Sequence, residues 1–163
     1  GVAGVAGGTL DTPGVKLMVS VGFGKTGSRR FAEAITYGAD NGARISSNSW
    51  AYLSPHVFPS SVRAAIDYYV DSFDGILVFA AANNNSYEPY YPGAYDKVVG
   101  VSATRNDGVR ASFSNYGPHV DVAAPGVSVY SISHGPNRYT YKSGTSMAAP
   151  HAAGIFALGV SAD

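Results

Sequence analysis

The chain has 163 residues, of which 45% are hydrophobic, so it is long enough to form one folded domain with a sizeable core. Eleven basic and eleven acidic residues cancel, and charged residues make up 13% of the chain. This balance argues against nucleic acid or an anionic membrane surface as a partner. The absence of cysteine excludes thiol catalysis, thiolate metal sites and disulfides. No apolar run approaches the roughly 18 to 20 residues that a membrane-spanning helix needs.

Hydrophobic spacing predicts strands and helices that alternate along the chain. Short apolar runs with branched residues indicate buried strands, and apolar residues at offsets of three, four, seven and eight indicate one face of a helix. In chain order the predicted elements are a strand at 15–21, a helix at 29–41 that Ser28 caps and Gly42 ends, a strand at 43–50, a helix at 59–71, strands at 75–82, 97–103 and 119–125, a hairpin or edge strand at 127–133, and an apolar helix from 145 or 146 to 160.

This order of elements predicts the α/β class, with a parallel sheet joined by crossover helices. In an open parallel sheet, ligands bind beyond the carboxyl ends of the strands. Three loops would meet there, namely 49–54, 83–91 and the entry to the last helix. Since no repeat or linker divides the sequence, residues 1–163 are expected to form a single domain.

The entry to the last helix contains a candidate nucleophile. Ser146 lies where a glycine-led turn becomes helical, beside backbone N–H groups that have no acceptor within the helix. These groups, at the positive end of the helix dipole, favour the oxyanion that forms when a hydroxyl attacks a carbonyl. A serine here can also be a simple helix cap, as can Ser143 or Thr145.

Residues 144–151, Gly-Thr-Ser-Met-Ala-Ala-Pro-His, resemble the nucleophile motif of the subtilisin-like serine proteases, the subtilases. The resemblance extends over nearly the whole chain, since segments at 1–7, 43–50, 78–84, 90–103 and 110–131 also resemble parts of that family. It implies a subtilisin-like three-layer architecture. The 163 residues would be the central and nucleophile-bearing part of a peptidase domain that is incomplete at both ends.

The resemblance implies roles for particular residues. Ser146 would be the nucleophile, and its backbone N–H together with the side-chain amide of Asn84 would stabilise the oxyanion. The family usually has glycine where this chain has Asn83, which leaves Asn83 and Asn85 as alternatives for the amide donor. No cofactor is required for this chemistry.

The resemblance also implies a peptide or protein substrate, bound as an added strand along residues 49–52. The residues implied to line the substrate pocket are Ser49, Trp50, Ala51, Ala81, Ala82, Asn83 and, near its base, Tyr90. Tyr90 would fill volume and favour small or flat apolar side chains. The alternative is that the tyrosines of 87–95 only pack within an irregular loop.

Further implications concern a cation, a propeptide and the location of the protein. Backbone carbonyls of Gly93, Tyr95 and Val98 resemble a weak cation site of the family, which allows a structural calcium or a monovalent ion and leaves the metal undetermined. The family resemblance also implies an inhibitory propeptide and an extracellular, secreted protein. Neither nucleic acid nor a membrane is expected as a partner.

A serine nucleophile needs a histidine base and an acid that orients the base. Subtilases have these residues in the order aspartate, histidine, serine, which places both partners before this chain. His151 follows Ser146 by five residues, about 140° around the helix axis, and so cannot readily reach the hydroxyl. His56, His119 and His134 lie in loops without a matching motif. The 163 residues alone are therefore expected to have little peptidase activity.

Two other functions are alternatives to the peptidase. The first is a non-catalytic peptide-binding module with the subtilase fold. The presence of both Ser146 and Asn84 favours the enzyme, because binding alone requires neither. The second is an α/β hydrolase, whose Gly-x-Ser-x-Gly motif is not met because Ala148 follows Met147.

Overall fold

The computed structural model describes residues 3–8, 11, 13–22, 30–133 and 138–162. Its elements in chain order are α1 (Ala3–Ala6), α2 (Phe31–Asp40), β1 (Ile45–Asn48), α3 (Ser60–Phe73), β2 (Ile76–Ala80), β3 (Val99–Thr104), β4 (Val122–Pro125), β5 (Val129–Ile132), β6 (Tyr139–Lys142) and α4 (Thr145–Val160). Strands β1 to β4 form a parallel sheet in chain order, and β5 pairs with β6 in a separate antiparallel hairpin. The predicted α/β class is confirmed.

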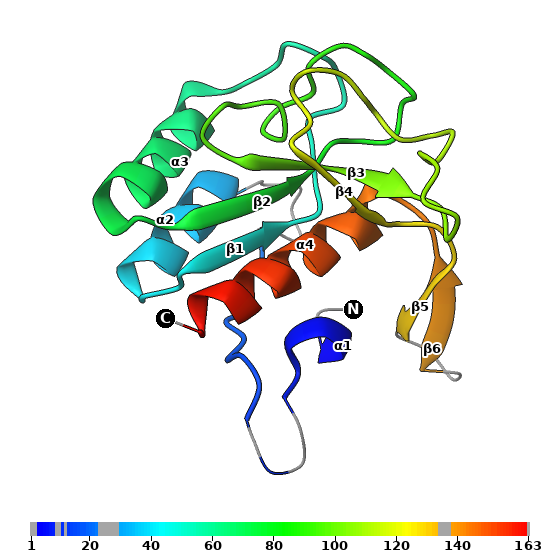
Figure 1. Cartoon of the computed structure of the whole chain (residues 1–163). Coiled ribbons are helices and arrows are strands. Elements are labelled where there is room, and N and C mark those ends of the chain that lie inside the picture. The colour runs from blue at the N-terminus through cyan, green and yellow to red at the C-terminus, as the bar shows by residue number, and fades with distance from the viewer. Residues whose placement is uncertain (1–2, 9–10, 12, 23–29, 134–137, 163) are drawn as a thin grey trace.

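The sheet is the middle of three layers, with α2 and α3 on one face and α4 on the other (Figure 1). Strand β2 contributes to both cores because its side chains alternate between the two faces. Leu77 and Phe79 pack with residues of α2 and α3, whereas Val78 and Ala80 pack with residues of α4. Burial on both faces explains why β2 has an uninterrupted apolar sequence.

The predicted helical faces are confirmed. Phe31 and Ile35 of α2 and Val62 and Ile66 of α3 are all buried, and they belong to the same cluster. The helix predicted to end at Gly42 ends at Asp40, and the expected cap Ser28 lies outside the described residues. No helix among the described residues has the length and apolar character that crossing a bilayer requires.

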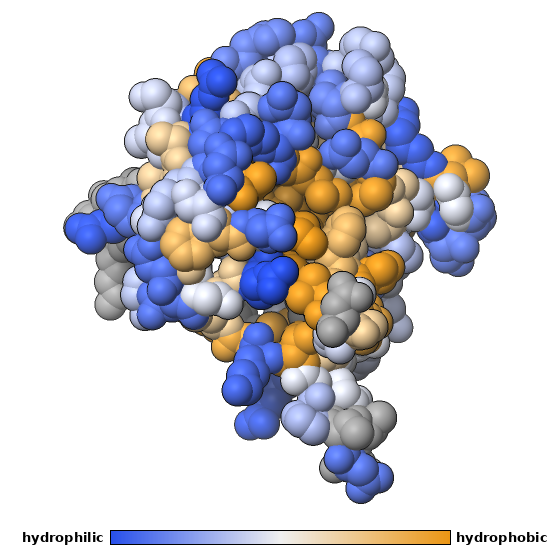
Figure 2. Space-filling view, turned by 60° about the vertical axis from the view of Figure 1, so that its left-hand side comes forward, coloured by the Kyte–Doolittle hydropathy of each residue, from blue (hydrophilic) through white to orange (hydrophobic). Residues whose placement is uncertain are grey.

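The strand predicted at 15–21 is wrong, because these residues have no regular secondary structure. Leu17, Val19 and Val21 are 68%, 83% and 79% exposed. Figure 2 shows apolar side chains gathered on one face of the molecule. A strand needs a neighbour that satisfies its backbone hydrogen bonds. A cavity lies between this segment and the edge strand β1, and within the described residues β1 pairs only with β2.

Two smaller differences concern the second half of the chain. The strand predicted at 119–125 begins only at Val122, because the preceding residues form a turn in which the Val120 N–H donates to the carbonyl of Gly117. The segment at 127–133, predicted as a short hairpin or an edge strand, contains the single strand β5. The antiparallel partner of β5, β6, was not predicted. Tyr130 faces Tyr141 across the hairpin, and both are exposed, so no buried face marks β6 as a strand in the sequence.

Candidate active site

The turn before α4 depends on a glycine. Gly144 has φ of 155°, a conformation that L side chains rarely adopt. Its N–H donates to the carbonyl of Gly126 at 2.8 Å, and its carbonyl accepts from the N–H of Met147 at 2.9 Å. This turn places Ser146 in the first turn of α4, where the N–H groups have no acceptor within the helix.

Ser146 and Ser49 are joined by two hydrogen bonds. The hydroxyl of Ser146 donates to the carbonyl of Ser49 at 3.3 Å, and the hydroxyl of Ser49 donates to the carbonyl of Ser146 at 2.8 Å. Ser49 follows the last residue of β1, so the carboxyl end of this strand meets the amino terminus of α4. The hydroxyl expected to react therefore lies at the edge of the sheet where ligands of such folds bind.

Asn83 connects the loop after β2 to the same turn. Its side-chain Oδ1 accepts from the backbone N–H of Thr145 at 2.8 Å and from the Thr145 hydroxyl at 3.0 Å. Because a backbone N–H can only donate, this contact fixes which end of the Asn83 amide faces the helix. The structure thus brings together Ser146, Ser49 and Asn83 from three of the loops that the sequence predicted to meet.

The neighbouring asparagines are held by a different loop. The N–H of Asn84 donates to Oδ1 of Asn115 at 2.8 Å, and Oδ1 of Asn85 accepts from Arg110 at 3.1 Å. Asn115 is fully buried. Sequence reasoning missed Asn115, because it lies in an irregular segment where only the fold shows what its side chain contacts.

The remaining residues predicted for the substrate pocket lie in different environments. Ala81 and Ala82 are buried directly after β2, Tyr90 is also buried, and Ala51 is half-buried. The Trp50 ring stacks on Phe31 of α2, with centroids 3.8 Å apart, so its side chain packs against that helix.

The loops after β1 and β2 are linked by their backbones. The N–H of Tyr52 donates to the carbonyl of Tyr91, and the N–H of His56 donates to the carbonyl of Pro89, both at 3.0 Å. These bonds hold the loop after β1 against residues 89–91, on either side of Tyr90, which is predicted to lie near the base of the substrate pocket.

No histidine among the described residues is hydrogen-bonded to the Ser146 hydroxyl. Nδ1 of His151 is bonded to the carbonyl of Met147 at 2.8 Å, and His56 pairs with Glu88 at 3.0 Å. Burial lowers the pKa of His119, whose buried Nε2 has no hydrogen-bond partner among the described residues. His134 lies outside the described residues.

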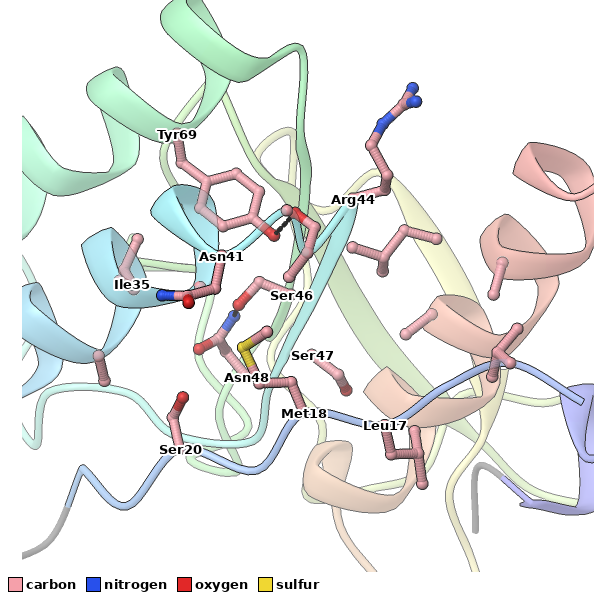
Figure 3. Close-up of a pocket in the computed structure, with 18 of the residues that line it drawn as sticks. Leu17, Met18, Ser20, Ile35, Asn41, Arg44, Ser46, Ser47, Asn48 and Tyr69 are labelled. Atoms are coloured by element: carbon pink, nitrogen blue, oxygen red, sulfur yellow. Dashed lines mark hydrogen bonds between the residues drawn. The ribbon is translucent and has the colours of Figure 1, made fainter.

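A cavity of about 770 Å³ lies between residues 15–22, α2, β1 and α4, and Ser146 is not part of its lining (Figure 3). Asn48 donates to the hydroxyl of Ser46 at 2.9 Å within this lining. The hydroxyl of Tyr69 donates to the carbonyl of Ala43, and burial raises the pKa of Tyr69 to about 12. Neither Ser146 nor Ser49 lines this cavity, but Trp50, one of the residues predicted for the substrate pocket, does.

Two of the three carbonyls expected to hold a cation have protein neighbours. The carbonyl of Tyr95 accepts from the N–H of Val98 at 3.1 Å, and the carbonyl of Gly93 packs closely against Gly100 of β3. Across the described ranges, no group of three or more acidic or histidine side chains is arranged to hold a metal ion.

The model of the Subtilase family matches residues 1–163. The chain belongs to the subtilase family. It is 38% identical over 161 residues to the thermophilic serine proteinase of Bacillus sp. (strain AK1), covering 97% of this chain and 37% of that protein. It is 40% identical over 127 residues to thermitase of Thermoactinomyces vulgaris, covering 78% of this chain and 44% of that protein.

A solved structure agrees with this assignment. A protease of Pseudoalteromonas arctica PAMC 21717 superposes with a TM-score of 0.74 and 31% identity, covering 86% of this chain and 49% of that chain. The subtilase chain described here spans less than half the length of each of these three proteins.

Proposed function

We propose that these residues form the nucleophile-bearing and substrate-binding part of a serine endopeptidase. The observation that carries the proposal is the position of Ser146 in the first turn of α4, hydrogen-bonded in both directions to Ser49 and next to the contact between Thr145 and Asn83. A helix cap needs no such convergence of loops from β1 and β2. Family membership and relatives named as serine proteinases support the same reaction.

In the proposed reaction the Ser146 oxygen attacks the carbonyl carbon of a peptide bond and passes its proton to a histidine base. The carbonyl oxygen becomes an oxyanion, for which we assign the Ser146 N–H and the side-chain amide of Asn84 as donors. The base returns the proton to the leaving amine, and water then releases the acyl group from Ser146. The Asn83 side chain, bonded to Thr145, would hold the first turn of α4 in place.

We further propose that the histidine and aspartate come from a part of the protein outside residues 1–163. The order of catalytic residues in the family supports this, as do the bonds of His151 and His56 to groups other than Ser146. A peptide or protein substrate would bind as an added strand along residues 49–52. Tyr90 would limit the pocket, so Tyr90→Gly should change the preferred peptide side chain.

A fluorophosphonate tests the nucleophile directly, because it modifies an activated serine hydroxyl covalently. In the protein that carries these 163 residues, we expect labelling that Ser146→Ala abolishes. Ser161→Ala is the matched control, since Ser161 lies exposed at the other end of α4 and its hydroxyl donates to the carbonyl of Leu158. Equal labelling of wild type and Ser146→Ala would contradict the proposal. Peptide binding by an unlabelled wild type would favour the non-catalytic module.

Three accompanying proposals rest on the family resemblance. A structural calcium or monovalent ion at the carbonyls of Gly93, Tyr95 and Val98 would be tested by thermal unfolding before and after chelation. An inhibitory propeptide would be tested by isolating the precursor and comparing its labelling with that of the processed protein. An extracellular location would be tested by looking for the protein in culture medium.

A further inference from the structure

We infer that Asn115 is a positioning residue for the proposed oxyanion site, acting through the backbone of the asparagine loop, which we define as residues 82–86. This inference rests on the proposed function. Asn115 lies between β3 and β4, in a segment with no residue bonded to Ser146, and its side chain is fully buried.

The first support is the set of bonds that Asn115 makes to the asparagine loop. Its Oδ1 accepts from the N–H of Asn84 at 2.8 Å and from the N–H of Ser86 at 3.2 Å. Its backbone N–H donates to the carbonyl of Ala82 at 3.1 Å. One buried residue therefore contacts the loop before, at and after Asn84, the residue assigned as the oxyanion donor.

The second support is the conformation of the asparagine loop. Ala82 and Asn85 have φ of 77° and 49°, values that are unfavourable for a non-glycine residue and persist only where surrounding contacts hold the backbone in place. The N–H of Asn85 donates to the carbonyl of Phe113 at 2.8 Å, which adds a bond from the same side as Asn115. The loop therefore depends on residues 113–115 for its shape.

The third support is the connection from this loop to the nucleophile. Asn83 lies between Ala82 and Asn84, both of which bond to Asn115, and its Oδ1 accepts from Thr145 next to Ser146. Contacts thus run from Asn115 through the asparagine loop to the first turn of α4. A shift of the loop would misplace the Asn84 amide relative to the reacting carbonyl.

The chemistry of the side chain adds a reason for an amide at this position. Nδ2 of Asn115 is buried without a hydrogen-bond partner among the described residues. Burying an unpaired donor is unfavourable, because the donor loses its hydrogen bonds to water. An aspartate would have two acceptor oxygens and no such donor. However, it would place a negative charge against the backbone of Asn84, close to where the oxyanion forms. The amide supplies the acceptor without that charge.

The variant Asn115→Asp separates positioning from folding, because it keeps the volume and the acceptor, replaces only the unpaired amide NH2, and adds a negative charge. We expect a fall in kcat of about tenfold or more, with little change in KM. The affinity for a peptide aldehyde, which forms a tetrahedral adduct, should fall in parallel. Lowering the pH should restore activity relative to wild type as the carboxyl becomes protonated. Asn106→Asp is the matched control, since the same charge is added at an exposed turn.

If Asn115→Asp does not fold, a second variant and a measurement on the wild type still test the inference. Asn115→Ser keeps a shorter, neutral acceptor and should lower kcat without the pH-dependent recovery. In the wild type, the amides of Asn84 and Ser86 should exchange hydrogen slowly, and rapid exchange of both would overturn the inference.

The outcomes distinguish this inference from the proposed function. If fluorophosphonate labels the wild type but Asn115→Asp has an unchanged kcat, only the positioning role of Asn115 is overturned. The positioning role is also overturned if the activity of Asn115→Asp falls only in proportion to the fraction of the variant that is folded. A wild type that is not labelled at Ser146 would overturn the proposed function, and this inference with it.

Discussion

Strand β2 and the segment Val15–Val21 contain the same kinds of residues but have different structures. Both are short apolar runs rich in branched side chains. In β2, Leu77 and Phe79 are at most 1% exposed, whereas Leu17 and Val19 are 68% and 83% exposed. The difference lies in the neighbours: β2 has β1 and β3 beside it and helices on both faces, whereas a cavity separates the segment from β1.

Apolar composition therefore predicts that a side chain is stable when buried, but not that the backbone around it pairs with another strand. A strand buries its backbone polar groups only when a neighbouring strand pairs with them. The sheet supplies two neighbours to β2. Among the described residues, none of the backbone bonds of β1 goes to residues 13–22.

The largest expected effect comes from a pair of leucine substitutions. Leu77→Ala should lower the free energy of unfolding by about 2–5 kcal/mol, because it leaves a cavity in a closely packed core. Leu17→Ala should change it by less than about 0.5 kcal/mol, since this side chain is mostly exposed. Urea unfolding of both variants measures the difference. A similar loss for the two would mean that the segment is buried in solution and that the comparison fails.

A smaller effect should come from Tyr69, whose hydroxyl joins α3 to Ala43, two residues before β1. Tyr69→Phe removes the hydroxyl that donates to the carbonyl of Ala43 and leaves that acceptor unpaired, at a cost of about 1–3 kcal/mol. Tyr68→Phe is the control, because its hydroxyl bonds to Asp40 at the surface. If the two variants unfold at the same urea concentration, the contact with α3 does not hold the edge strand in place.

The smallest expected effect is a pH dependence of the free energy of unfolding that His119, three residues before β4, causes. Burial lowers the pKa of His119, so the folded protein binds this proton less readily than the unfolded chain does. The stability due to neutral His119 is therefore complete above the unfolded pKa of about 6.5 and is lost as pH falls below it toward the folded pKa. Unfolding midpoints at pH 7.5 and 5.5 should differ less in His119→Gln than in wild type. Equal differences would remove His119 as the cause.

Much of the fold followed from local patterns. The spacing of Ile35, Val62 and Ile66 predicts helical faces that the structure buries, and the run from 75 to 82 contains β2. Local patterns failed where pairing decided the outcome, as in the segment at 15–21 and in β6. Whether these two segments pair with another strand depends on residues elsewhere in the sequence. Hydrophobic periodicity within a short window does not detect those residues.

The candidate site was partly visible in the sequence. The motif around Ser146 marks the helix entry, and the alternation of strands and helices predicts which loops meet there. The contacts of Asn83 with Thr145 and of Asn115 with Asn84 join residues 62 and 31 positions apart. Such pairs depend on three-dimensional placement, and no local spacing singles them out.

The mutual bonds between Ser49 and Ser146 have a dynamic consequence. Ser49 directly follows β1, and among the described residues β1 pairs with another strand on one side only. Outer strands fluctuate more than inner ones because fewer bonds restrain them. The hydroxyl of Ser146, proposed as the nucleophile, is thus coupled to the thermal motion of the sheet's edge. A change that makes this edge more rigid would also restrict the positions that the Ser146 oxygen can take.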